Sequence, residues 1–306
     1  MALLEVENLS IAFEQYANGL RKTNVRTIAD LSLTAKAGEI VAVFGSSGSG
    51  KSLLAHAILG LLPDNASMTG TIRYDGGPLD ENRLKQLRGS EIAFVPQSVN
   101  FLDPLMRVGA QVRGAAGSGR TEAQRAIFRR YGLNPSVERM YPFQLSGGMA
   151  RRVLVAAAAI SGARLIVADE PTPGMHERDL AEALDSFKEL AVGGSAVLFI
   201  THDIEAALRI ADRVAVFYAG TTVEIAPAAD FAGDGERLRH PYSRALWRAL
   251  PQNAFVPIPG QQPRPHDLPP GCLFAPRCAI ATDACMEKRP EMREIRGGEA
   301  RCWHAS

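Results

Sequence analysis

One short segment near residue 50 combines glycines, serines and a lysine in the order of a phosphate-binding loop. It consists of Gly45, Ser46, Ser47, Gly48, Ser49, Gly50, Lys51 and Ser52. This order fits the pattern G-x-x-x-x-G-K-[ST]. Glycines allow backbone N–H groups to turn inward toward an anion, and a helix that begins there contributes the positive end of its dipole. The segment is therefore predicted to hold phosphate groups.

A second anion site is predicted where Leu145, Ser146, Gly147 and Gly148 precede a helical pattern. Ser146 is a favourable N-cap residue, and the two glycines leave backbone N–H groups open to a ligand. One nucleotide needs only one phosphate cradle. We therefore infer that this second helix start faces the nucleotide of another subunit. Taken alone, the motif could equally be the ordinary start of a helix.

Two carboxylates, Asp169 and Glu170, end an apolar run over residues 165–168. Successive residues at a strand end point in different directions, so the two can have separate tasks. Asp169 can hold Mg²⁺ through water, and Glu170 can orient or deprotonate an attacking water. His202 and Gln97 each end a further strand pattern, and His202 is well placed to contact a γ-phosphate. Either of these two alone would be structural in most proteins, but the whole set in this order favours chemistry.

Alternating strand and helix patterns surround these residues. Residues 40–44 form a continuous apolar run, typical of a strand covered on both faces, and apolar residues at helix spacing follow from Leu53 onward. This strand-loop-helix context argues against a chance match in a glycine-rich turn. Strands that alternate with helices predict a mainly parallel sheet, preceded by a small β layer. The predicted strands of the sheet occupy residues 40–44, 165–168, 196–200, 214–218 and 223–225.

Length and composition are those of a nucleotide-binding protein with room for two domains. The chain has 306 residues, a formal charge of +1 and no prominent basic run, so its charge pattern does not indicate nucleic acid. The N-terminal segment has no cationic start and is not a secretory signal. The longest apolar stretch, residues 153–168, is interrupted by Ser161, Gly162 and Arg164. We therefore expect no transmembrane span.

In this order the motifs resemble those of the ABC ATPase family. The resemblance implies an α/β fold of the P-loop NTPase class, with an N-terminal antiparallel β subdomain, a RecA-like parallel sheet core and a helical signature subdomain. It also implies a head-to-tail dimer in which each ATP lies between the Walker A loop of one subunit and the signature of the other. A P-loop small-molecule kinase would lack the signature. The Walker A, Q-loop, signature, Walker B and H-loop elements correspond to residues 45–52, Gln97, residues 145–148, residues 165–170 and His202.

The resemblance, together with the chemistry above, implies a role for each catalytic residue. Lys51 binds the β- and γ-phosphates, Glu170 is the general base, and His202 senses the γ-phosphate. Gln97 approaches Mg²⁺ beside the nucleotide. Because every expected hydrolytic residue is present, an active ATPase is expected. The Mg²⁺ site is implied to comprise Ser52, Gln97 and Asp169.

Further contacts with ATP are implied by the same resemblance. Phe13 corresponds to the aromatic residue that stacks on adenine, and Tyr16 is the less favoured alternative. Leu53 joins the loop residues in binding the nucleotide. The partner's ATP is implied to contact Ser146, Gly147 and Gly148.

Two positions depart from the family pattern. The family has Asp four residues after the Thr of its E-P-T sequence, whereas this chain has His176. That loop crosses the dimer interface, so the change puts equal behaviour of the two sites in doubt. Met149 replaces the commonest residue, Gln, after the signature, which is a milder departure.

The composition changes after about residue 235, where prolines and then cysteines accumulate. Residues 240–251 and 271–285, with the final Cys-Trp, resemble the C-terminal extension of ATPase subunits in dipeptide, oligopeptide and nickel importers. We expect an ATPase domain over residues 1–235, with a helical subdomain at about residues 98–160. An irregular extension is expected over residues 236–306.

This second resemblance implies an ATP-hydrolysing subunit that powers an importer of di- or oligopeptides, nickel or metal chelates. The implied partners are a second ATPase subunit, two transmembrane permeases and an extracytoplasmic binding protein, but no nucleic acid. A heterodimer of ATPase subunits is favoured over a homodimer, bound peripherally at the cytoplasmic face of the inner membrane. The alternative is a non-transport ABC ATPase that acts on nucleic acid or ribosomes. The single ATPase module and the unremarkable charge argue against it.

Four cysteines, Cys272, Cys278, Cys285 and Cys302, have the spacing C-x₅-C-x₆-C-x₁₆-C. A cytosolic ATPase is a poor setting for disulfides, so metal ligation and free thiols are the alternatives. Zinc modules usually contain a tight C-x₂₋₄-C pair, which this segment lacks. Four thiolates suit a [4Fe–4S] cluster, and such tails in the similar importer subunits favour it. The segment also has too little apolar periodicity for a core of its own, so a structural cluster is the favoured prediction, with zinc and unligated thiols kept open.

Overall fold

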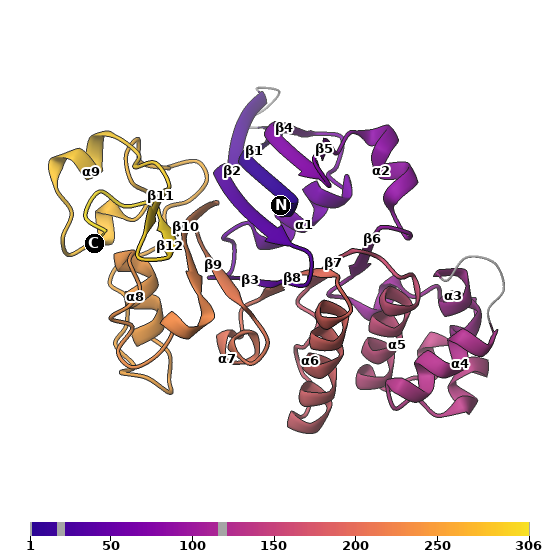
Figure 1. The fold of residues 1–306 in the computed structure, drawn as a ribbon. Helices are drawn as coiled ribbons and strands as arrows, with labels where there is room; N and C mark the ends of the chain where they lie inside the picture. Colours follow the sequence, from indigo (N-terminus) through magenta and orange to yellow (C-terminus); the bar gives the residue numbers. More distant parts are fainter. Residues whose placement is uncertain (1, 17–21, 116–120, 306) are drawn as a thin grey trace.

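The computed structural model describes residues 2–16, 22–115 and 121–305, which fold into two β-sheets with helices around them (Figure 1). The smaller sheet is antiparallel and has the order β2-β1-β4-β5. On β1, Leu4 and Val6 are buried while Glu7 is exposed, the alternation expected of a half-buried strand. The predicted N-terminal β layer is therefore confirmed. Its strands are β1 (Ala2–Tyr16), β2 (Lys22–Lys36), β4 (Ala66–Tyr74) and β5 (Gly77–Pro78).

The larger sheet has the order β11-β12-β10-β9-β3-β8-β7-β6. Strands β9, β3, β8, β7 and β6 run parallel to one another, and all five predicted strands belong to this sheet. The hairpin from β9 to β10 is antiparallel and turns through Ala219 and Gly220, both with positive φ. The strands are β3 (Ile40–Gly45), β6 (Ile92–Val95), β7 (Leu165–Asp169), β8 (Ala196–Thr201), β9 (Arg213–Tyr218) and β10 (Thr221–Pro227).

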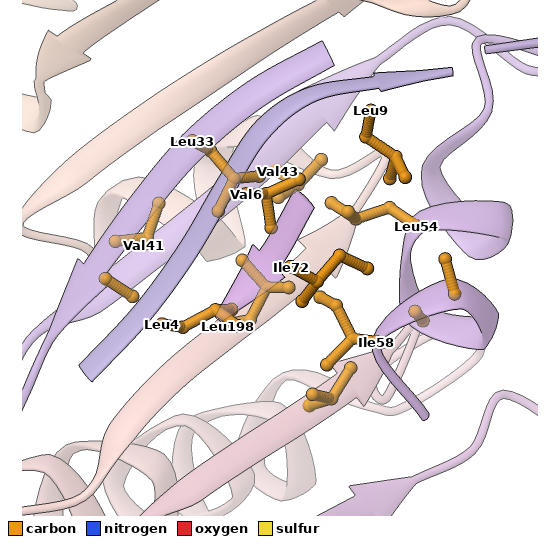
Figure 2. Packing of buried hydrophobic residues seen from close by; sticks show 14 of the residues in the cluster. Leu4, Val6, Leu9, Leu33, Val41, Val43, Leu54, Ile58, Ile72 and Leu198 are labelled. Atoms are coloured by element: carbon orange, nitrogen blue, oxygen red, sulfur yellow. The ribbon is translucent and has the colours of Figure 1, made fainter. Parts of the chain in front are cut away.

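One hydrophobic cluster joins the two sheets through helix α1 (Lys51–Leu59). Figure 2 shows Leu4 and Ile72 of the antiparallel sheet near Leu198 of the parallel sheet and Ile58 of α1. Strand β3 is buried along its whole length, as predicted for a strand covered on both faces. The loop between β3 and α1 is therefore anchored at both ends in the core.

Helices α5 (Gly147–Ile160) and α6 (Glu177–Val192) cover the other face of the parallel sheet. Phe187 of α6 meets Phe199 of β8 edge to face, with ring centroids 5.3 Å apart. No helix among the described residues is both long and apolar enough to cross a membrane. The other helical elements before the extension are α2 (Glu81–Leu87), η1 (Val99–Phe101), α3 (Val108–Ala115), α4 (Thr121–Arg130), η2 (Pro135–Arg139), η3 (Pro142–Gln144) and α7 (Ile204–Leu208).

The C-terminal extension contains more regular structure than its sequence predicts, and it shares the core of the sheet. Strand β12 pairs with β10 in antiparallel register, so the extension lengthens the main sheet at one edge (Figure 1). Phe274 and Trp247 pack in one cluster with Tyr218 of β9. The extension is therefore ordered by packing against the sheet without a core of its own. Its elements, together with the short turn after β10, are η4 (Ala228–Asp230), α8 (Pro241–Arg248), η5 (Ala275–Arg277), α9 (Asp283–Glu287), β11 (Arg293–Ile295) and β12 (Gly298–Ala300).

A buried ion cluster ties this extension to β10. Arg239, whose side chain is 2% exposed, donates to Asp230 Oδ2 over 2.8 Å and to Glu224 Oε1 over 3.4 Å. The same guanidinium donates to the carbonyl oxygens of Ile295 and Arg296 in the β11–β12 hairpin. Buried charges are tolerated when they are paired and hydrogen-bonded, and removing one partner typically costs about 3–5 kcal/mol. Arg239 therefore fixes the hairpin beside the sheet.

Candidate functional site

The loop between β3 and α1 has the backbone conformation that a phosphate cradle requires. Gly48 and Gly50 have φ values of 76° and 96°, which favour glycine over any residue with a side chain. A Cβ atom at Gly45 would collide with the carbonyl oxygen of Phe217. Ser47 and Gly48 are exposed, and the space beside Gly48 is open. The loop thus has room for an anion on its outer side.

Lys51 begins α1 and is almost completely buried. Its Nζ donates to the carbonyl oxygens of Gly45 and Ser46 over 2.8 and 3.2 Å. Burial lowers the pKa of Lys51, while the nearby charges of Glu170 and Asp169 act in the opposite direction. The ammonium group is therefore held within the loop, where phosphate oxygens would add the negative charge that favours its protonated form.

Asp169 and Ser52 lie together at the end of β7. The hydroxyl of Ser52 donates to Asp169 Oδ1 over 3.2 Å. Burial raises the pKa of Asp169, and the hydrogen bond from Ser52 partly opposes this shift. Carboxylate and hydroxyl oxygens are the hard ligands that Mg²⁺ prefers, so this pair fits the predicted ion in its donor chemistry.

Glu170 and His202 are brought into direct contact. Glu170 Oε2 lies 2.8 Å from His202 Nδ1 and accepts a longer bond of 3.4 Å from the backbone N–H of His202. The Glu170 side chain is 9% exposed and that of His202 is 64% exposed. Glu170 also has a φ of 47°, a costly conformation for a residue with a Cβ that is concentrated at functional sites.

Arg151 is a site residue that the sequence reasoning missed. Its Nη1 donates to the carbonyl oxygens of Glu170 and Pro171 over 3.4 and 3.2 Å. These bonds connect the signature helix α5 to the end of β7. The arginine follows the signature closely in sequence, but no local pattern reveals which carbonyl groups a helical arginine will reach.

The signature residues begin α5 as predicted. Ser146 is the N-cap, and its Oγ accepts from the backbone N–H of Met149 over 3.2 Å. Ser146 and Gly147 are exposed, and nothing lies within 4 Å of the position that a Cβ on Gly147 would take. Within the described part of the chain, no hydrogen bond joins this helix start to the loop at residues 45–52. The open helix start is thus separate from the chain's own cradle.

The other residues predicted to contact the nucleotide or its Mg²⁺, Gln97, Phe13 and Tyr16, differ in how far they are buried. Gln97 is exposed just past β6, whose last residue, Val95, pairs with Ala168 of β7, the neighbour of Asp169. Phe13 is half-buried and packs against the cluster between the sheets. Tyr16 is 69% exposed and lines a cavity of about 850 Å³ together with residues 265–266 and 268–270 of the extension.

Three further residues singled out from the sequence are Ser49, Leu53 and His176. Ser49 is fully buried, and its Oγ has no hydrogen-bond partner in the part of the chain that the structure describes. Leu53 is half-buried against the cluster between the sheets. His176 is the N-cap of α6 but makes no side-chain capping bond, whereas the aspartate usual in the family could accept one.

The four cysteines converge on one small cavity of about 10 Å³, which Phe274 also lines. All four are free. Burial raises the pKa of Cys272 to about 11 and also raises the pKa values of Cys278 and Cys302. Over the described residues, no group of three or more His, Cys, Asp or Glu is arranged to hold a metal ion. The thiols are thus brought together, but their arrangement is not that of a formed ligand set.

A contact between the extension and the phosphate loop was also missed. Ser46 Oγ donates to Gln262 Oε1 over 2.7 Å, across 216 positions of the sequence. Gln262 lies in the proline-rich segment, where no periodic pattern indicated a contact with the nucleotide site.

Two family models match this chain. One, described as ABC transporter, matches residues 28–173, and the other, described as Oligopeptide/dipeptide transporter, C-terminal region, matches residues 223–285. The first match includes the phosphate loop, the signature and the two carboxylates that follow β7. The second includes three of the four cysteines.

Curated relatives extend the similarity over almost the whole chain. The dipeptide transport ATP-binding protein DppD of Escherichia coli strain K12 is 35% identical over 327 residues, covering 99% of this chain and 96% of that protein. The oligopeptide transport ATP-binding protein OppD of Mycobacterium tuberculosis is 35% identical over 314 residues, covering 96% of this chain and 50% of that protein.

Solved structures share the fold of the two sheets and their helices. A dimeric ATP-binding cassette in a post-hydrolysis state bound to ADP and Pi has a TM-score of 0.65 and 26% identity, covering 74% of this chain and 98% of that one. The cassette cbiO1 of Clostridium perfringens, part of the ABC transporter complex cbiONQ, has a TM-score of 0.61 and 25% identity, covering 75% of this chain and 90% of that one.

Proposed function

Because this chain belongs to the ABC transporter family and carries the oligopeptide and dipeptide C-terminal region, we propose that it hydrolyses ATP to drive the import of di- or oligopeptides. The observation that carries the proposal is that the loop after β3 holds Lys51 through a backbone carbonyl oxygen while the next residue, Ser52, donates to Asp169 at the end of β7. The names of the curated relatives favour peptides over nickel or metal chelates as the cargo.

Within this site the residues divide the work of hydrolysis. The loop N–H groups and Lys51 bind the β- and γ-phosphates, and Glu170 orients and deprotonates the attacking water. His202, held against Glu170, is the contact for the γ-phosphate. Mg²⁺ bound with ATP neutralises phosphate charge. Its ligands on this chain are proposed to be Ser52, Asp169 and Gln97.

Further contacts extend the site to the adenine and to a second subunit. Phe13 is proposed to stack on adenine, with Tyr16 as the alternative. The exposed helix start at Ser146, with Gly147 and Gly148, is proposed to complete the ATP site of a second ATPase subunit, in a heterodimer rather than a homodimer. Support comes from the open surroundings of Gly147.

The assembly that this function needs has parts outside this chain. We propose two permease subunits and an extracytoplasmic binding protein, with this subunit held peripherally at the cytoplasmic face of the inner membrane. The ATPase domain is assigned to residues 1–235, with a helical subdomain at about residues 98–160. The extension is assigned to residues 236–306, although its strand β12 belongs to the same sheet.

The test is ATP turnover in membranes that contain the assembled transporter. Binding protein loaded with a dipeptide or an oligopeptide is expected to raise turnover, whereas nickel-loaded binding protein, RNA and DNA are not. Lys51→Ala removes the phosphate-binding ammonium and should abolish the response. Lys85→Ala changes an exposed lysine on α2 and should leave the response intact. Stimulation by RNA or DNA but not by loaded binding protein would refute the transport function.

For the cysteines we propose a structural [4Fe–4S] cluster, supported by the convergence of four thiols on one cavity. Metal ligation requires deprotonated thiols, and a bound metal offsets the raised pKa values of Cys272, Cys278 and Cys302. The four thiols must move closer together for ligation, and packing on the sheet already orders the segment. Zinc and unligated thiols therefore remain the competing outcomes.

The cluster is tested by anaerobic purification followed by iron, zinc and absorbance measurements. We expect a brown protein with about four irons per chain and broad absorption near about 400 nm. Replacing both Cys278 and Cys285 by Ser should bleach it and expose residues 251–303 to protease, while ATP binding through Lys51 survives. A colourless, metal-free preparation with a protease-resistant tail would refute the cluster and identify buried thiols.

A further inference from the structure

The C-terminal extension reaches the phosphate-binding loop at Ser46. The hydroxyl of Ser46 donates to Gln262 Oε1 over 2.7 Å, and Tyr242 of α8 lies against the same residue. We propose that the extension is a positioning element of the ATP site: Gln262 holds the first turn of the loop and thereby sets its affinity for nucleotide. The inference rests on the proposed function, because it assumes that the loop binds ATP.

Ser46 is engaged through its carbonyl oxygen and its hydroxyl. Its carbonyl oxygen accepts from Lys51 Nζ over 3.2 Å, and its hydroxyl donates to Gln262. Burial raises the pKa of Tyr242, and the polar groups of the neighbouring Ser46 oppose this rise. The hydroxyl of Ser46 is therefore committed to the extension.

The Tyr242 ring is fixed by an aromatic group that joins three segments. It lies 4.4 Å from the ring of Tyr218 at the end of β9 and 5.3 Å from that of Phe274, between ring centroids. Arg277 donates to the Tyr218 hydroxyl over 3.2 Å. Tyr242 is 2% exposed. Because packed aromatic rings have few alternative rotamers, the phenol oxygen is held at one place beside Ser46.

The backbone of α8 adds a second constraint on this tyrosine. His240 caps the helix, and its Nδ1 accepts from the Tyr242 N–H over 3.0 Å. The first turn of α8, which carries Tyr242, is thus capped by His240. Phe274 also lines the cysteine cavity. A single packed path therefore runs from the cysteines through Phe274 and Tyr242 to Ser46.

A phosphate loop that the extension already holds in place loses less conformational freedom on binding a phosphate group than an unsupported loop would. Losing one such hydrogen bond is therefore expected to weaken nucleotide binding by about threefold to tenfold. By thermodynamic linkage, bound nucleotide must stabilise the contact between the extension and the phosphate loop by the same factor. Hydrogen exchange near Gln262 should accordingly slow when nucleotide binds.

The experiment is equilibrium titration of the full chain with MgADP, which needs neither hydrolysis nor partner subunits. Gln262→Ala is expected to raise the Kd about threefold to tenfold. Gln261→Ala, at the exposed neighbouring position, is expected to leave the Kd unchanged. Thermal melting checks that each variant is folded.

A double-mutant cycle shows whether the effect passes through the loop. Ser46→Ala removes the hydroxyl, so Gln262→Ala should cause little further change when the two are combined. Equal Kd values for Gln262→Ala, Gln261→Ala and the unaltered chain would overturn the inference. So would fully additive effects of Ser46→Ala and Gln262→Ala. If the unaltered chain binds no MgADP, the proposed function itself fails, and the two failures are thereby distinguished.

Discussion

Glu170 has three properties that rarely coincide in a carboxylate with a purely structural role. It is buried, its backbone φ is positive, and its side chain contacts an exposed histidine. Glu170 contacts His202, whereas Asp169 accepts from Ser52. The two adjacent carboxylates can therefore have different roles, Asp169 at the proposed Mg²⁺ site and Glu170 beside the proposed attacking water.

We predict that Glu170→Gln abolishes turnover but not nucleotide binding. The amide keeps the size of the side chain but cannot take a proton, so turnover in the assembled transporter should fall by a factor of at least about 100. The Kd for MgADP should change little, because Lys51 and the loop are intact. Glu177→Gln, at an exposed position on α6, is the matched control. Near-normal turnover of Glu170→Gln would exclude this residue as the base.

At the scale of elements, α8 owes its position to a buried histidine. His240 is 1% exposed, and burial lowers its pKa to about 3. In the unfolded chain the ordinary pKa is about 6.5. Above that value neither state binds a proton at this residue. Below it only the unfolded state does, so the stabilisation present at neutral pH is lost as the pH falls toward 3.

The corresponding prediction concerns His240→Asn, which keeps a capping acceptor and removes the titration. Between pH 7 and pH 5 the free energy of unfolding of the unaltered chain should fall by about 2 kcal/mol more than that of the variant. Urea unfolding at several pH values measures the difference. Parallel pH profiles for the two proteins would mean that His240 titrates normally in the folded state.

The elements around the phosphate loop could be predicted because their signals are local. Residues 40–44 are continuously apolar, and Ser146 stands directly before a helical pattern, so β3 and the start of α5 follow from short windows of sequence. Strand β12 has only three residues and no alternation to detect. One signal was available, since Gly297 marks a two-residue turn between β11 and β12, in which Arg296 and Gly297 both have positive φ.

Parts of the candidate site could not be predicted because they depend on contacts between distant segments. Ser46 and Gln262 are 216 positions apart, and Arg151 reaches two backbone carbonyl groups rather than side chains. Neither contact leaves a periodic or compositional trace. The extension was expected to be irregular because its own apolar residues are sparse, yet Phe274 and Trp247 pack on a core that the sheet supplies.

At the scale of the whole molecule, the cradle and the open helix start at Ser146 belong to one chain, but no hydrogen bond among the described residues joins them. The purified chain alone is therefore predicted to hydrolyse ATP slowly. A second ATPase subunit and the permeases should raise the rate. Turnover by the lone monomer at the full rate of the transporter would contradict the shared site.

The companion variant is Ser146→Arg, which places a bulky cation at the open helix start. It should abolish the stimulation yet leave binding of MgADP to the chain's own loop intact. Ser67→Arg, at an exposed position on β4, is the control. If the chain pairs with itself, a mixture of Lys51→Ala and Ser146→Arg should recover part of the activity, because each mixed pair contains one intact site.

The pairing of β12 with β10 also has a consequence for the chain while it is being made. Strand β10 ends at Pro227, and its neighbour begins at Gly298. At bacterial and eukaryotic synthesis rates of about 5–20 residues per second, the edge of β10 waits roughly 4–14 s for its neighbour to be synthesised. An open strand edge is a template for pairing with other chains. Synthesis that stalls between these two strands would therefore leave a nascent protein that already contains the phosphate loop and both carboxylates but whose sheet edge can still pair with another chain.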